Sequence, residues 1–380
     1  GKTRRGHATS AMLHRFVCWS TLVVCNAFPH FGYKQSVFTN GCHGKWGRCF
    51  LSRTKLSSLA TTRLDPPSRE EDTAAERDWQ HVLQVAEDAA LQAGKIMLEG
   101  SRDILQSKAN RRDLVTESDL ACQECVRSAL SEAFPNDRFL GEEDVGAGSL
   151  ASQESLRNAL DIDGEATVYL WIVDPIDGTT NFQAGLPLYC VSIGLVSIPN
   201  CNSKQQSQRP ERVLGVVYNP VLGEMVSAVK GRGAYVNGKR LIVGETSSSP
   251  LSQSIINIGF PVVQEATLQA SAKAVAALAL QVRALRMIAC ASQAMVWVAQ
   301  DKIQSYTSWD LNAWDVCAGI VIVEEAGGCV VDMRQNDDDD DKDDRNTLSI
   351  RDMIVCSPSG GTELGESIRR VLEENDCIDY

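Results

Sequence analysis

The chain has 380 residues, of which 43% are apolar and 23% are charged, and its formal net charge is −12. This length allows one large buried core or two smaller ones, and the acidic balance argues against a nucleic-acid-binding protein. His81 is the only histidine beyond residue 64, so catalysis by a Ser-His-Asp device and His-rich zinc sites are excluded unless His81 serves them. No apolar run reaches the length of a membrane-spanning helix, and we predict no membrane partner.

Residues 1–64 have the composition of a targeting presequence. They contain ten Lys/Arg and no Asp or Glu, whereas the rest of the chain has 27 Lys/Arg against 49 Asp/Glu. Segment 12–27, with its basic start and short apolar run, is typical of a signal peptide, and the acid-free segment 28–64 is typical of a transit peptide. With Phe28 at the junction, this pattern resembles the presequences of plastid proteins in algae with secondary plastids. We therefore expect a disordered presequence and plastid import, or a cytoplasmic protein if the extension carries no address.

A folded domain is expected over residues 75–380, after a linker at 65–74. Helical and strand-like apolar spacings both occur in it, which predicts a mixed α/β fold. We expect its N-terminal half to extend to about residue 245 and its C-terminal half to begin at about residue 246.

Two helices are predicted at the start of this domain. Residues Trp79–Glu99 have apolar side chains at helical spacing and precede Gly100, which is typical of a helix end. The second helix is expected at 120–134, capped by Thr116 or Ser118. Asp119 then lies in or near its first turn, where a negative charge is favourable even without a catalytic role.

Three adjacent acids follow a short predicted strand. Residues Arg138–Gly141 form the strand, and Glu142 is the first of the acids. A short apolar lead-in to several acids indicates that the chain enters a cleft. The Ser-, Gly- and acid-rich segment 146–165 predicts a surface loop or flap.

The most informative stretch is a strand that ends in two further acids. Residues 168–173 are apolar, and Asp174 and Asp177 follow three residues apart. Pro175 has no N–H to donate, so we expect the strand to end there. The Gly-Thr-Thr sequence at 178–180 suits a helix start whose free N–H groups bind an anion. Hard oxygen ligands beside such a helix favour a divalent cation that carries a phosphate, although a capped helix after a strand would show the same pattern.

The remaining sequence predicts more strands and then an alternation of strands and helices. Asn237-Gly238 is a strong two-residue hairpin signal. The expected strands are 189–198, 213–218, 224–229, 234–236, 240–243, 255–258, 283–287, 303–306, 329–332 and 353–356. The expected helices are 265–279, 292–300, 313–326 and 364–374. The polar insert 199–212 and the acidic run 337–344 predict loops, because a continuous block of like charge repels itself and stays solvated.

Three segments, in this order, resemble the inositol monophosphatase family of Mg²⁺-dependent, lithium-sensitive phosphatases. They are residues 113–119 together with the Gly-Glu-Glu sequence at 141–143, residues 171–182, and residues 314–328. The resemblance extends over roughly residues 75–375. It implies a layered αβαβα sandwich of the type shared with fructose-1,6-bisphosphatase, a small phosphate ester as substrate, and a homodimer.

The resemblance also implies roles for individual residues. The positions that match the family's metal ligands, for two or three Mg²⁺ ions, are Glu142, Asp174, the Ile176 carbonyl, Asp177 and Asp315. Asp119 and Thr179 match the pair that positions and deprotonates the attacking water, with Glu142 as a further catalytic residue. The positions that match phosphate or substrate contacts are Lys108, Asp177, Gly178, Thr179, Ala291, Ser308 and Asp315.

Three positions depart from the pattern of inositol-specific members. Ala184 stands where many members have His, and Cys290 lies in a loop that is usually Gly-Ser/Thr-Ala. Ser308 stands where inositol-specific members have an acid, and the nearby Asp310 is a possible substitute. The implied metal ligands are complete, but the residues that would read the alcohol are altered.

Three functions are therefore compared. The first is a Mg²⁺-dependent phosphomonoesterase that hydrolyses a small polyol phosphate, above all inositol monophosphate, by attack of a metal-activated water. The second is the same chemistry on histidinol phosphate, another sugar phosphate or a bisphosphate nucleotide. The third is a catalytically silent binding protein.

Overall fold

The computed structural model describes residues 77–108, 114–162, 167–199, 209–244, 248–261, 264–334, 348 and 350–378. All of them belong to one unit, Asp72–Tyr380. The expected presequence, the linker and the acidic run 337–344 lie outside the described residues. None of the helices in the described ranges combines the length and the hydropathy that crossing a membrane requires.

Among the described residues, seven strands form a mainly antiparallel sheet in the order β3-β4-β5-β6-β7-β8-β9, in which only the β3–β4 pair is parallel. The strands are β3 (Arg138–Gly141), β4 (Val168–Asp177), β5 (Cys190–Ile198), β6 (Glu211–Asn219), β7 (Glu224–Val229), β8 (Gly233–Val236) and β9 (Lys239–Arg240). The predicted hairpin joins β8 to β9. Its turn residues Asn237 and Gly238 have φ values of 49° and 73°, and positive φ at both positions is what a type I′ turn requires.

A second, five-stranded sheet in the described C-terminal residues has the order β11-β10-β12-β14-β13. β10 pairs in parallel with β11 and β12, and the other pairs are antiparallel. Its strands are β10 (Ile255–Ile258), β11 (Ala284–Arg286), β12 (Ser305–Ser308), β13 (Cys329–Asp332) and β14 (Met353–Cys356). A separate hairpin of β1 (Ile104–Ser107) and β2 (Leu114–Thr116) lies before α2 in the chain.

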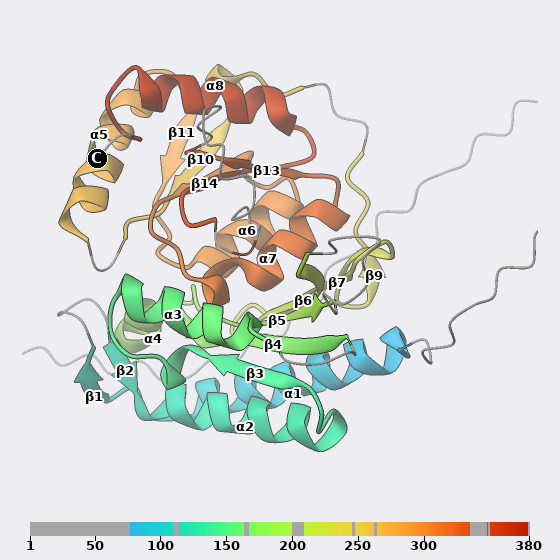
Figure 1. Ribbon diagram of the computed structural model, residues 1–380. Helices are drawn as coiled ribbons and strands as arrows, with labels where there is room; N and C mark the ends of the chain where they lie inside the picture. Colours follow the sequence, from blue (N-terminus) through green and yellow to red (C-terminus); the bar gives the residue numbers. More distant parts are fainter. Residues whose placement is uncertain are drawn as a thin grey trace, which may run out of the picture. The chain divides into compact units, whose positions relative to one another are not determined.

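The helices form layers on both sides of the two sheets (Figure 1). One face of the seven-stranded sheet carries α1 (Trp79–Glu99) and α2 (Glu117–Ala133). The layer between the sheets contains α6 (Ala291–Ala299) and α7 (Ala313–Glu325), and the outer layer contains α5 (Glu265–Ala279) and α8 (Gly361–Glu373). The αβαβα sandwich predicted from the sequence is thereby confirmed.

Strand β14 is covered by helices on both faces. Met353 and Val355 pack in the cluster that contains α6 and α7, whereas Ile354 and Cys356 pack with α5 and α8. Successive side chains of a strand point to opposite faces of the sheet, so a strand that is covered on both faces is apolar at every position. This explains why β14 reads as a continuous apolar run.

Most predicted elements are confirmed, with boundaries that differ by up to three residues, but two predictions were wrong. The segment expected to be a surface loop contains α3 (Ser149–Leu160), a largely polar helix that buries Ser152 and Leu156. β4 does not end at Pro175 but continues to Asp177. Its register against β5 shifts between Asp174 and Asp177, and such a bulge accommodates a residue without an N–H.

Two glycines allow α7 to lie close to the seven-stranded sheet. Gly194 on β5 and Gly215 on β6 are directly opposite each other. A Cβ on Gly194 would lie 2.4 Å from the Sγ of Cys317, and a Cβ on Gly215 would lie 2.2 Å from the carbonyl oxygen of Ala318. Because Cys317 and Ala318 lie in the turn that follows Asp315, this close contact fixes the start of α7 relative to the sheet.

We predict that Gly215→Ala destabilises the protein by about 1–3 kcal/mol, because the new methyl group would overlap backbone atoms that cannot rotate away. Equilibrium chemical denaturation measures this change in unfolding free energy. Gly244→Ala is the matched control, since a Cβ there meets open space. Equal effects of the two substitutions would contradict the proposed close packing of α7.

Candidate active site

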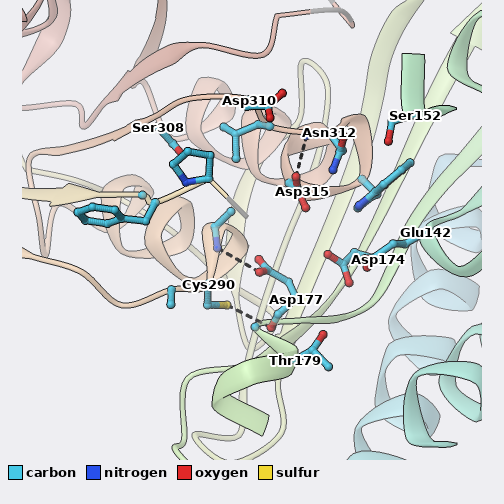
Figure 2. A pocket seen from close by; sticks show the side chains of 18 of the residues that line it. Glu142, Ser152, Asp174, Asp177, Thr179, Cys290, Ser308, Asp310, Asn312 and Asp315 are labelled. Carbon is cyan, nitrogen blue, oxygen red and sulfur yellow. Dashed lines mark hydrogen bonds between the residues drawn. The ribbon is translucent and has the colours of Figure 1, made fainter. Parts of the chain in front are cut away.

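A pocket lies between the carboxyl end of β4 and the loops of the C-terminal half. The sequence-predicted residues that line it are Lys108, Glu142, Asp174, Ile176, Asp177, Gly178, Thr179, Ala291, Ser308 and Asp315. The remaining predicted residue, Asp119, lies next to Thr179, whose hydroxyl is 3.4 Å from Asp119 Oδ1. Figure 2 shows the acids Glu142, Asp174, Asp177 and Asp315 facing the same space, although they come from three segments of the chain.

Asp174 is the acid with the least compensation. Its residue is 2% exposed, and its Oδ1 has no hydrogen-bond partner among the described residues. Burial, followed by the negative charges of Glu142, Asp177 and Asp315, raises the pKa of Asp174 well above its usual range. A buried carboxylate in such surroundings requires either a proton or a cation.

Asp177 is held by the start of helix α6. The backbone N–H of Ala291 donates to its Oδ1 at 3.2 Å, and that of Ser292 donates to its Oδ2 at 2.5 Å. The Cys290 thiol contacts the Asp177 carbonyl oxygen at 3.4 Å. Burial raises the pKa of Asp177, and the hydrogen bonds from Ser292 and Ala291 oppose this rise. The N–H of Ala291, which the sequence resemblance assigns to substrate, therefore orients an acid in this structure.

Asp315 lies in the first turn of α7 and is part of a capping box. The backbone N–H of Asn312 donates to its Oδ2 at 2.7 Å. This arrangement satisfies a backbone donor at the helix start and fixes the orientation of the carboxylate. Burial and the nearby charge of Asp177 raise the pKa of Asp315 to about 7.

Glu142 is partly exposed, with 21% of its side chain accessible. It follows β3 directly, in the short turn of 3₁₀ helix Glu142–Asp144. The Nζ of Lys108 lies 3.4 Å from its Oε1 and 2.9 Å from the Oε2 of Glu143. Burial raises the pKa of Glu142 to about 8 even though the charge of Lys108 opposes the shift.

Asp119 and Thr179 form a second, buried contact beside these acids. The Asp119 residue has 0% exposure, and its carboxylate accepts hydrogen bonds from the N–H of Thr116 at 2.8 Å and from the Thr116 hydroxyl. Thr116 is thus the cap of α2, and Ser118 instead donates to the Ser101 carbonyl. The Thr179 hydroxyl is 3.4 Å from Asp119 Oδ1 and 3.0 Å from the Ile176 carbonyl oxygen. Burial raises the pKa of Asp119, against the hydrogen bonds from Thr116.

The donor set of this pocket fits a hard divalent cation. No three His, Cys, Asp or Glu side chains in the described ranges converge tightly enough to hold a metal ion by themselves. Mg²⁺ does not need such a cage, because it is usually bound by one or two carboxylates together with waters and substrate phosphates. The unpartnered oxygen of Asp174 and the raised pKa values of its neighbours are the features that a bound cation would relieve.

The sequence reasoning missed several residues that line the pocket. Asn312 had a usable signal, since an Asn three residues before Asp315 is a capping-box pattern. Ser149 and Arg351 gave no such signal, because one lies in a polar helix predicted as a loop and the other follows the acidic run. Asp310 was considered, and it does line the pocket.

The model of the inositol monophosphatase family matches residues 78–375. The chain belongs to this family. Inositol monophosphatase 1 of Solanum lycopersicum is 35% identical over 255 residues, which cover 66% of this chain and 84% of that protein. Inositol monophosphatase 1 of Homo sapiens is 31% identical over 257 residues, covering 67% of this chain and 84% of that protein.

Solved structures agree with this assignment. The inositol monophosphatase from Anabaena (Nostoc) sp. PCC 7120 matches with a TM-score of 0.59 and 25% identity, covering 79% of this chain and 98% of that one. As a member of the inositol monophosphatase family, the protein is a phosphoric monoester hydrolase that acts on small phosphate esters. The enzyme class expected from the sequence is thus confirmed.

Stabilisation of the protein by Mg²⁺ is predicted to increase with pH. The raised pKa values of Asp315 (about 7) and Glu142 (about 8) mean that these acids bind protons more tightly folded than unfolded, where they titrate near about 4. Their contribution to the stability of the metal-free protein therefore falls as the pH rises from about 4 to about 8. A divalent cation such as Mg²⁺ is expected to bind the ionised form and to reverse this loss.

We expect a fixed Mg²⁺ concentration to raise the Tm more at about pH 8 than at about pH 6, as measured by differential scanning fluorimetry. K⁺ at the same ionic strength is the control for screening. A Mg²⁺-dependent shift that does not vary with pH would refute the link between these acids and the cation.

Proposed function

We propose that the protein is a Mg²⁺-dependent phosphomonoesterase that hydrolyses a small polyol phosphate, with inositol monophosphate as the first candidate. The observation that supports this most strongly is the buried, unpartnered oxygen of Asp174 among three other acids. The groups that would hold two or three Mg²⁺ ions are Glu142, Asp174, the Ile176 carbonyl, Asp177 and Asp315. When bound, Mg²⁺ neutralises phosphate charge and lowers the pKa of water.

In this proposal, Thr179 and Asp119 prepare the water that attacks phosphorus. The Thr179 hydroxyl reaches both Asp119 and the Ile176 carbonyl, so it is positioned to orient a water at the end of β4. Asp119 accepts the proton. Its raised pKa makes it a better base than a solvated aspartate, and the two hydrogen bonds from Thr116 keep it in place.

The phosphate is proposed to bind where β4 turns into α4 (Thr179–Ala184). Gly178 has a φ of 89°, and a Cβ there would lie 2.8 Å from the Leu188 carbonyl oxygen, so the turn requires glycine. This turn presents the backbone N–H groups of Gly178 and Thr179 to an anion. Lys108, which lies across the pocket beside Glu142, adds a positive charge for the same phosphate.

The names of the relatives favour inositol monophosphate as substrate. The side of the pocket that is lined by Ser308 and Asp310, here called the alcohol side, is also compatible with other phosphate esters. Ser308 is only 2% exposed and does not supply the acid that inositol-specific members have at this position. Histidinol phosphate is therefore the alternative substrate, and a silent binding protein is the alternative function. We also propose, from the family likeness and from the composition of residues 1–64, a homodimer that is imported into a plastid.

A panel of phosphate esters with Mg²⁺, with and without Li⁺, is the first test. We expect phosphate release from inositol monophosphate that disappears with a chelator and falls with Li⁺. Preference for histidinol phosphate would favour the alternative substrate. No release from any ester would favour the silent binding protein and would refute the proposed function.

Asp174→Asn is predicted to lower kcat by about 1,000-fold, because loss of a metal-binding charge removes several kcal/mol of transition-state stabilisation. The fold should be retained, and its stability without metal should not fall, since the substitution removes an uncompensated buried charge. Steady-state kinetics and thermal denaturation measure the two effects. Asp88→Asn, on the exposed face of α1, is the control, and near-normal kcat in Asp174→Asn would refute the metal assignment.

A further inference from the structure

The alcohol side of the pocket contains a fifth acid, Asp310, that is not part of the metal-binding set. It lies between β12 and α7, and its φ of 53° places it in the left-handed region that aspartate tolerates better than most residues. Its side chain is 6% exposed and lines the pocket together with Ser308 and Asn312. Figure 2 shows Ser308 and Asp310 on one side of the pocket, with Asp174 and Glu142 on the other.

Arg351, which precedes β14 in the chain, forms an ion pair with Asp310. Its guanidinium Nη2 forms an ion pair with the Asp310 carboxylate and lies 3.3 Å from the Asp310 carbonyl oxygen. Its Nη1 lies 3.4 Å from the Oδ1 of Asn312. The backbone is fixed as well, since the Leu311 N–H donates to the Arg351 carbonyl at 3.0 Å and the Asp310 N–H donates to Asp352 at 2.8 Å. The side chain of Arg351 is 18% exposed and also lines the pocket.

Two neutral side chains complete the surroundings of the Asp310 carboxylate. Ser149, at the start of α3, lies 2.9 Å and 3.2 Å from its two oxygens. Gln264 lies 3.1 Å from the Ser149 hydroxyl and 3.5 Å from Asp310 Oδ1. Ser149 and Asp310 are separated by 161 residues in the chain, so this contact joins the two halves of the domain across the pocket.

The charges at this side of the pocket therefore cancel. Among the described residues that line the whole pocket, the positively charged side chains are those of Lys108 and Arg351. Lys108 lies beside Glu142, on the side of the proposed metal ligands, so Arg351 is the positive charge next to Asp310. The guanidinium of Arg351 pairs with the carboxylate of Asp310, so the two charges compensate each other. A cationic alcohol would meet no net negative charge here, whereas hydroxyl groups would meet a rigid set of donors and acceptors.

We propose that Arg351 is a specificity-determining residue, which neutralises Asp310 and so makes the pocket select neutral, hydroxyl-rich alcohols over alcohols that carry ammonium or imidazolium groups. This inference rests on the proposed phosphatase function and names the chemical class of its leaving group. Selection works by exclusion, because a cationic alcohol would lose water at this side of the pocket without gaining a free carboxylate as a partner.

The test compares kcat/KM for inositol 1-phosphate with kcat/KM for histidinol phosphate, which carries the cationic groups. The wild-type enzyme should prefer the neutral ester by about tenfold or more, because no free carboxylate offsets the water that the cationic groups lose on binding. Arg351→Met leaves the Asp310 charge exposed and should lower this preference by about tenfold. Asp310→Asn leaves Arg351 uncompensated and should raise the preference.

The opposite directions of these two effects separate electrostatic selection from a merely structural role, which would change both esters alike. Arg351→Lys keeps the charge and should keep the preference within about threefold of the wild type. Circular dichroism verifies that each variant is folded. If Arg351→Met does not fold, Asp310→Asn still tests the inference, because a preference that does not rise in this variant would overturn it.

Equal turnover of the two esters by the wild type, or preference for the cationic ester, would overturn the inference while leaving the phosphatase function intact. The same holds if Arg351→Met and Asp310→Asn shift the ratio in the same direction. Failure of the wild type to hydrolyse any ester would overturn both the inference and the proposed function.

Discussion

The central constraint on this structure is the repulsion between the acids that it holds in one pocket, which the surrounding groups have to compensate. Each acid except one receives dedicated donors from the backbone or a neighbouring side chain. Asp177 is bound by the first N–H groups of α6, Asp315 by the capping box of α7, and Asp119 by Thr116. Asp174 has no such donor on Oδ1, so the fold leaves one strong acceptor available to a cation. Because interactions between charges strengthen with burial, this uneven distribution of donors defines the site.

The donors come from helix starts because the topology brings those starts to the carboxyl end of β4. α6 and α7 lie between the two sheets, and α7 contacts the seven-stranded sheet at the paired glycines of β5 and β6. A larger residue at either position would push the helix outward and carry Asp315 with it. Packing between α7 and the sheet, next to the pocket, therefore affects the distance between the acids inside it.

The residues of the candidate pocket could be predicted from the sequence where residue chemistry and local structure coincide. Asp174, Asp177 and Gly178 stand in one short segment, and their residue types alone restrict what the turn can do. Residues whose decisive contact is distant in the chain, or which lie in a polar element, could not be predicted in this way. The helix α3 is largely polar, and its Ser149 meets Asp310 from 161 residues away. Arg351 follows an acidic run whose composition indicated only a solvated loop. The strand end at Pro175 was misjudged because a bulge removes the need for the missing N–H.

The two sides of the pocket differ in their use of main-chain groups and of side chains from connecting segments. The side with the acids uses main-chain groups, such as the amides of residues 291 and 292 and the left-handed turn at Gly178. The opposite side is made of side chains carried by connecting segments, including Ser149, Asp310 and Arg351. Substitution of a few residues in the connecting segments can thus change which alcohol the pocket accepts as leaving group, while the side with the acids is unchanged. Such a scaffold is well suited to acquiring new substrates by small steps.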